Sequence, residues 1–78
     1  MKANLVAEFV KKGIPAQKVA KEIANTIGVS EKTARNKIGS TTEFTLREAM
    51  MINDACFDGE QKLDYLFQDV PMAAEQPA

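Results

Sequence analysis

The stretch that decides the fold is residues 20–39, which read AKEIANTIGVSEKTARNKIG. Apolar residues recur three and four positions apart on both sides of Gly28, a pattern typical of two amphipathic helices joined by a short turn. Gly28 tolerates the positive φ that such a turn requires. Ser30 is a favourable N-cap for the second helix, because its hydroxyl can accept from the free amides of the first turn. The stretch therefore predicts a helix-turn-helix.

The packing of these two helices follows from the same residues. Ala24 has to be small because the helices cross closely there, and Val29 fills the gap between them. Ile23, Ala34 and Ile38 attach the pair to the rest of the core. The polar side of the second helix then faces outward. Such a helix fits the major groove of B-DNA, which is ~12 Å wide, with its N-terminal residues at the base edges.

The rest of the chain has the same helical periodicity, and no stretch alternates with a period of two. We expect an all-α fold of five short helices. The pair around Gly28 begins near Pro15 and is closed by Gly39, and the others cover about residues 3–12, 45–57 and 61–67. Thr45 and Glu48 fit a capping box. The residues expected in the core of the last two helices are Leu46, Ala49, Met50, Ile52, Asn53, Phe57, Leu63, Tyr65, Leu66 and Phe67.

The 78 residues suffice for one small domain, which we assign to residues 1–69. Residues 70–78 carry Pro71 and Pro77 and show no periodicity, so we expect a flexible C-terminal tail. No apolar run approaches the ~20 residues that cross a bilayer, and residues 1–4 lack the plan of a signal peptide. We expect no membrane association and a cytoplasmic location in a bacterial host cell.

Several chemistries are disfavoured by the composition. The chain has no histidine, the commonest general base and transition-metal ligand, and its one cysteine, Cys56, cannot form an internal disulfide. Cys56 is expected to be a buried small hydrophobe. The carboxylates of Asp54, Asp58, Glu60 and Asp64 lack the spacing of a calcium loop and are expected to form a solvated face. We expect no enzyme activity, cofactor, metal or small-molecule substrate.

Charge is distributed unevenly along the chain, although the net charge is only -1. Residues 11–48 contain eight basic and four acidic side chains, whereas residues 49–78 contain one basic and six acidic ones. This pattern favours a cationic face and an acidic back, and a mixed solvated surface is the alternative.

The order of landmarks resembles the lambda-repressor-like helix-turn-helix family, also called XRE or Cro-type regulators, and is similar to the small prophage-type members of Gram-positive bacteria. The matching segments are Gly28–Thr33, Asn36–Gly39, Glu43–Ala49 and Leu63–Phe67. The resemblance covers about residues 4–68 and implies a compact five-helix DNA-binding domain. One departure is that residues 13–28 are about one helical turn longer than the family pattern. Another is that Ala34 stands where the family usually has a larger aliphatic residue, so Met50, Met51 or Phe44 would fill the space, or the helix would pack more loosely.

The resemblance also implies a set of DNA-contacting residues. Lys32, Thr33 and Asn36 match the family's base-contacting positions, with Glu31 and Arg35 beside them. Lysine can donate to guanine, asparagine can pair with adenine and glutamate can accept from cytosine, while an ordinary solvated helix face is the alternative. The family's phosphate-contacting position falls on Ala20, which has no donor, so Lys21, Gln17 or Lys18 would replace it. The complete predicted set is Lys21, Ser30, Glu31, Lys32, Thr33, Arg35, Asn36, Lys37, Ser40, Thr41 and Thr42.

The predicted function is that of a sequence-specific double-stranded DNA-binding transcription regulator, a phage or prophage repressor or Cro-like protein. Its partner would be a DNA operator, bound as a homodimer, and the end of the fifth helix with the tail is one place for the dimer contact. The alternative is a protein-interaction module on the same scaffold, such as an antirepressor or an antitoxin-like partner. The acidic back, and Glu31 on the reading face, favour that alternative.

Overall fold

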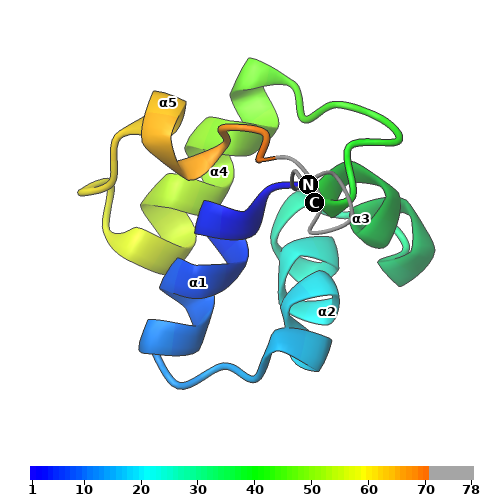
Figure 1. The fold of residues 1–78 in the computed structure, drawn as a ribbon, viewed down its shortest axis with the longest axis horizontal. Coiled ribbons are helices and arrows are strands. Elements are labelled where there is room, and N and C mark those ends of the chain that lie inside the picture. Colours follow the sequence, from blue (N-terminus) through cyan, green and yellow to red (C-terminus); the bar gives the residue numbers. More distant parts are fainter. Residues whose placement is uncertain (71–78) are drawn as a thin grey trace, which may run out of the picture.

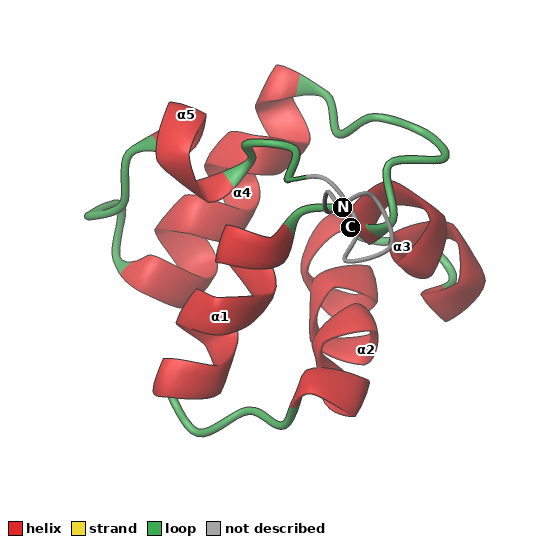
Figure 2. Ribbon diagram, in the orientation of Figure 1, coloured by secondary structure: helices red, strands yellow, loops and turns green. Residues whose placement is uncertain are grey.

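The bounds of the helices follow the capping residues of the sequence. A computed structural model describes residues 1–70 of the chain. The helices of that part are α1 (Ala3–Lys11), α2 (Ala16–Ile27), α3 (Glu31–Ile38), α4 (Leu46–Phe57) and α5 (Leu63–Leu66) (Figure 1). Residues 1–70 contain no strand, so the all-α prediction is confirmed for them. Figure 2 shows the helices joined by loops, with a long loop arching from α3 to α4.

Three local signals act as predicted. Gly28 has a φ of 75° and ends α2 in the left-handed conformation. Ser30 caps α3, because its Oγ accepts from the Thr33 amide at 3.1 Å. Thr45 and Glu48 form a complete capping box, with both reciprocal hydrogen bonds at 3.0 Å. These caps satisfy amides that helix geometry leaves without partners.

Gly39 closes α3 as predicted, with a right-handed φ of -78°, and the left-handed residue of this turn is Ser40, with a φ of 69°. One predicted bound needs correction. The fifth helix is shorter than expected, because the backbone of Gln61 is held by a side chain of α4. The Asn53 amide donates to the Gln61 carbonyl at 2.8 Å, and the Gln61 amide donates back to Asn53 at 3.2 Å. This pairing also explains why polar Asn53 can be buried.

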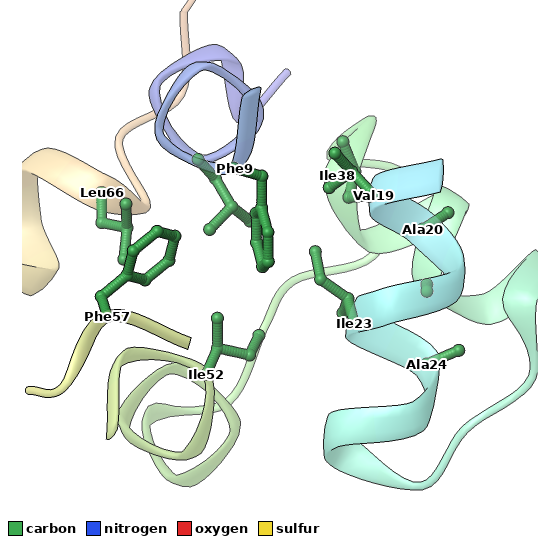
Figure 3. Close-up of a cluster of buried hydrophobic side chains, with 11 residues drawn as sticks. Phe9, Val19, Ala20, Ile23, Ala24, Ile38, Ile52, Phe57 and Leu66 are labelled. Carbon is green, nitrogen blue, oxygen red and sulfur yellow. The ribbon is translucent and has the colours of Figure 1, made fainter. Parts of the chain in front are cut away.

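The core lies between α1, α2 and the C-terminal half of α4 (Figure 3). Phe9 points from α1 into the space between Ile52 of α4 and Ile23 of α2, and all three side chains are fully buried. The rings of Phe9 and Phe57 meet edge to face, with centroids 5.0 Å apart. Leu66 of α5 is fully buried beside them, so even this short helix is anchored by an apolar side chain.

Some residues predicted in the core lie at the surface instead. Leu46 is 69% exposed and Met50 is 50% exposed, because α4 buries the opposite face, with Ala49 and Ile52. Tyr65 is 39% exposed, and its hydroxyl donates to Glu8 Oε2 at 2.9 Å, which keeps the phenol at the rim of the core.

Close packing of α3 on α2 depends on small residues. Ala34 of α3 is fully buried, and Ala20 and Ala24 of α2 belong to the same core cluster. Phe44 is packed against that cluster, whereas Met50 and Met51 are exposed and do not fill space beside Ala34. Small side chains on both helices let the two backbones approach, so no large aliphatic residue is needed at position 34.

Single contacts describe the surroundings of Cys56 and the start of the predicted tail. Cys56 is half-buried, packed against the core, with its sulfur 3.7 Å from Thr26 Oγ1. Val70, which we expected in a free tail, donates its amide to the Met1 carbonyl at 2.8 Å. The remainder of the predicted tail, residues 71–78, lies outside the described residues. None of the helices within residues 1–70 is long and apolar enough to span a membrane.

The turn between α2 and α3 generates the first prediction. Gly28→Ala should reduce the free energy of unfolding by about 1–2 kcal/mol, since a Cβ is strained at a left-handed φ even where space is open. Gly39→Ala is the matched control and should change it by less than about 0.5 kcal/mol, because φ is ordinary there and the Cβ would lie 3.4 Å from the Arg35 oxygen. Urea unfolding of both variants measures the difference. Equal losses would contradict this account of the turn.

Candidate nucleic-acid interface

Helix α3 stands at one side of the molecule, with α2 between it and α1 (Figure 1). Only two of its side chains, Ala34 and Ile38, are buried. These lie four residues apart and hence on one face of the helix. Six side chains remain. Lys37 lies beside the buried face, and we call the other five, Glu31, Lys32, Thr33, Arg35 and Asn36, the outer face of α3.

Most of this outer face is open to solvent. Glu31, Lys32 and Arg35 are exposed, and Thr33 and Asn36 are half-buried. Of the predicted base-contacting residues, Lys32 is therefore fully accessible, and Thr33 and Asn36 are accessible in part. The accessible groups include an ammonium, a guanidinium, a carboxylate, a hydroxyl and an amide, which together can donate to and accept from base edges.

Two of the charges on the outer face neutralise each other. Arg35 Nη1 lies 2.7 Å from Glu31 Oε2, one turn away along the helix. Lys32 has no ion pair within residues 1–70 and keeps its charge available. Exposed pairs of this kind contribute little to stability, so a stronger ligand can displace Glu31 from Arg35.

Lys37, predicted to contact DNA, is turned inward by the structure. Its side chain is only 12% exposed, its Nζ lies 3.1 Å from Glu48 Oε1, and it donates to the Glu43 carbonyl at 3.0 Å. Burial raises the pKa of Glu48, but hydrogen bonds from Thr45 and Lys37 outweigh that effect and lower it. Lys37 therefore joins α3 to the start of α4 and is already neutralised.

In the loop after α3, some polar groups form hydrogen bonds within the protein and others are exposed to solvent. Ser40 donates its hydroxyl to Asp69, and its oxygen accepts from Lys2 Nζ at 3.0 Å. The amides of Thr41 and Thr42 bind the Asn36 carbonyl at 2.9 and 3.4 Å. Both threonines are exposed, so their hydroxyls, and not their backbone amides, are the groups left for a partner.

Lys2 is the residue that sequence reasoning missed. Its side chain is 2% exposed, and its Nζ lies 3.0 Å from Ser40 Oγ, 3.2 Å from Glu43 Oε1 and 2.8 Å from Asp69 Oδ1. Its amide also donates to the carbonyl of Ile38, at the end of α3, at 2.8 Å. We call Lys2, Ser40, Glu43 and Asp69 the Lys2 cluster. A lone lysine in a polar chain start gives no sequence signal of this role.

The cluster keeps its charges through mutual pairing. Burial lowers the pKa of Lys2, but the hydrogen bonds and charges of Asp69 and Glu43 outweigh it and raise the pKa above its usual value. The hydrogen bonds from Lys2 and Ser40 lower the pKa of Asp69 to about 2. The cluster thus fixes the loop after α3 by ionic contacts that persist at neutral pH.

Helix α2 carries exposed polar side chains outside the core. Lys21 and Lys18 are exposed, as is Gln17, whereas Ala20 is buried and faces the core. A cleft of about 350 Å³ lies between the first turns of α2 and the end of α3. Its lining residues are Met1, Val6, Ala16, Gln17, Val19, Ala20, Arg35, Ile38 and Gly39. Because Gln17 and Arg35 both line it, the start of α2 and the outer face of α3 border the same depression.

Comparison of the chain with protein-family models, with curated proteins and with solved structures finds no match. Within residues 1–70 there is no group of three or more cysteine and carboxylate side chains able to hold a metal ion. The site is therefore characterised by its own geometry: a polar helix face, a cleft that it shares with Gln17 of α2, and the hydroxyls of the following loop.

The Lys2 cluster generates a prediction on pH. Because the pKa of Asp69 is lower in the folded chain than its usual 3.8, its carboxylate stabilises the fold above about pH 4, and this contribution is lost as the pH falls towards 2. Asp69→Asn should therefore unfold at lower urea concentration at pH 7, and its difference from the unchanged chain should disappear near pH 2. Glu60→Gln, an exposed carboxylate outside the cluster, is the control. A difference that is the same at every pH would refute the role of Asp69.

Proposed function

We propose that this chain is a sequence-specific double-stranded DNA-binding regulator of transcription. In this proposal α2, the turn at Gly28 and α3 form a helix-turn-helix, and α3 enters the major groove as the recognition helix. One observation carries the proposal: the buried side chains of α3, Ala34 and Ile38, share one face, and the opposite face carries the exposed Glu31, Lys32 and Arg35. The resemblance of residues 4–68 to the lambda-repressor-like family also supports it.

Each accessible group has a defined task on DNA. Lys32 would donate to guanine O6 and N7, and Asn36 would make a two-point contact with adenine. Arg35, once released from Glu31, would reach a guanine or a phosphate. The hydroxyls of Thr41 and Thr42, with Lys21 of α2, would bind phosphates and set the register without reading sequence.

Three predicted contact residues take supporting roles in this proposal. Ser30 caps α3, Lys37 joins α3 to α4 and Ser40 belongs to the Lys2 cluster. Their polar groups are already used inside the protein, so they would position the outer face and not contact DNA themselves. The interface would then consist of Lys21, Glu31, Lys32, Thr33, Arg35, Asn36, Thr41 and Thr42.

The mechanism we propose is occupancy of an operator. One short helix reads few base pairs, so two copies on half-sites about one helical turn apart would supply the specificity. Such a protein would act in the cytoplasm of a bacterial host, where it would block or guide polymerase. The near-zero net charge limits non-specific attraction to DNA, so the base contacts on α3 would supply the specificity, and the cations around them would supply the salt-dependent part of the affinity.

A protein-interaction module on the same scaffold is the second candidate. The Glu31–Arg35 pair at 2.7 Å favours it, because it places a carboxylate where phosphates would approach and neutralises one of the cations. In that case the outer face of α3 would bind a protein surface that carries both hydrogen-bond acceptors and hydrogen-bond donors. Failure to bind any duplex, together with a stable complex with another protein, would select this candidate.

The outer face of α3 generates the third prediction. A duplex enriched from a random pool, or the DNA upstream of the gene, should bind with an affinity that falls steeply with salt. Lys32→Ala and Asn36→Ala should each weaken specific binding by about 1–3 kcal/mol, and Asn36→Ala should relax the preference at one base pair. Fluorescence anisotropy with matched and scrambled duplexes measures both effects.

Lys62→Ala is the matched control for charge, since Lys62 is an exposed lysine that directly precedes α5, and α5 lies on the other side of the molecule from α3 (Figure 1). It should leave specific binding nearly unchanged. Full affinity in an Arg35→Ala and Asn36→Ala double variant, or an equal loss with Lys62→Ala, would contradict the assigned face.

A further inference from the structure

Helix α4 has an outward face that the rest of the described chain does not cover. Leu46, Met50 and Met51 are 69%, 50% and 40% exposed, three large apolar side chains within six residues. Leu46 and Met50 are one turn apart and lie side by side, whereas Met51 is one turn from Arg47 on the neighbouring row of the helix, and both rows face away from the buried Ile52. The exposed apolar side chains therefore lie on both sides of the line that joins Arg47 and Asp54, one turn or less from it.

Two opposite charges lie on the same side of α4. Arg47 and Asp54 are exposed, and neither has an ion pair within residues 1–70. They are seven residues apart, about two helical turns, and hence lie nearly in line along the helix. Ala55 follows Asp54 and is exposed as well. We call Leu46, Arg47, Met50, Met51, Asp54 and Ala55 the outer face of α4.

The spacing of the two charges makes this face complementary to itself. The midpoint between Arg47 and Asp54 falls between Met50 and Met51. If a second α4 is laid antiparallel against the first about a two-fold axis at that midpoint, each Arg47 lies opposite the Asp54 of the other copy. The methionines of both copies then meet at the centre, where their flexible side chains can fill the seam.

We propose that this chain self-associates through the outer faces of α4, antiparallel and with two-fold symmetry. The partner on this face is a second copy of the chain. A two-fold contact brings the same surface of both copies together, so that surface has to be complementary to itself, and here the contact forms two Arg47–Asp54 pairs. A parallel arrangement would place Arg47 against Arg47 and is disfavoured. One helix face buries less than the ~1,600 Å² of a standard interface, so the dimer is weak, with a dissociation constant in the micromolar range or above.

The dimer is independent of the proposed DNA contact. The outer face of α4 shares no residue with the outer face of α3, and self-association is measured without DNA. A failure of one proposal therefore leaves the other standing. The contact we expected at the end of the fifth helix involves other residues, and substitutions on α4 distinguish the two.

Charge reversal on α4 tests the proposal most sharply. Sedimentation velocity over roughly 10 µM to 1 mM should show a monomer–dimer equilibrium for the unchanged chain. Arg47→Asp and Asp54→Arg should each raise the dissociation constant about tenfold or more, because each converts two attractive pairs into two repulsive ones. Carrying both changes in one chain should restore the dimer.

A mixture of the two single variants gives the most specific test of the Arg47–Asp54 pairs. An Arg47→Asp chain presents two carboxylates and an Asp54→Arg chain two guanidinium groups, so an equimolar mixture should form a heterodimer that neither forms alone. Thermal unfolding checks that each variant is folded, and Lys62→Asp controls for a charge change elsewhere. A chain that stays monomeric throughout the range, single variants that dimerise normally, or a mixture that does not associate would each overturn the proposal.

Discussion

The buried ammonium of Lys2 is the constraint on which the placement of α3 depends. Taking a lysine out of water is costly unless oxygen atoms replace its hydration, and here Ser40, Glu43 and Asp69 do so at 2.8–3.2 Å. These partners come from the loop after α3 and from the segment after α5, while the Lys2 backbone bonds the end of α3 itself. One side chain thus ties the chain start, the loop and the C-terminal segment together. Removing it would release the loop that follows the proposed recognition helix.

Further contacts fix α3 at its start and in its last turns. Ser30 and the left-handed Gly28 fix its start, and Lys37 joins its last turns to Glu48 of α4. The polar side chains of Ser30 and Lys37 are therefore engaged inside the protein, where they position α3. The polar side chains that remain exposed on this helix belong to its outer face. Helix α4 has a similar division, with a buried face in the core and a second face of apolar and oppositely charged side chains. The two exposed helix faces differ in chemistry: polar and charged groups make up the face of α3, and exposed apolar side chains accompany the two charges on the face of α4.

Local features could be predicted from the sequence because local geometry determines them. The periodicity, Gly28, Ser30 and the Thr45–Glu48 box were each correct, since each acts within four residues. The Lys2 cluster could not be predicted, because its partners lie 38 to 67 positions away. The exposure of Leu46, Met50 and Tyr65 was missed for a related reason: apolar spacing shows which residues share a face, and only packing decides which face is buried. Lys37 was assigned to DNA by its position on α3, and its pairing with Glu48 depends on the approach of α4.

The central claim is that the outer face of α3 and the following loop meet a DNA duplex. Amide chemical shifts, recorded by NMR while an enriched duplex is added to the isotope-labelled chain, test it directly. The account predicts that the largest changes cluster at residues 30–36 and 41–42, with smaller ones near Lys21 and none around α5. Changes confined to α4 and α5, or no change at any duplex concentration, would contradict it.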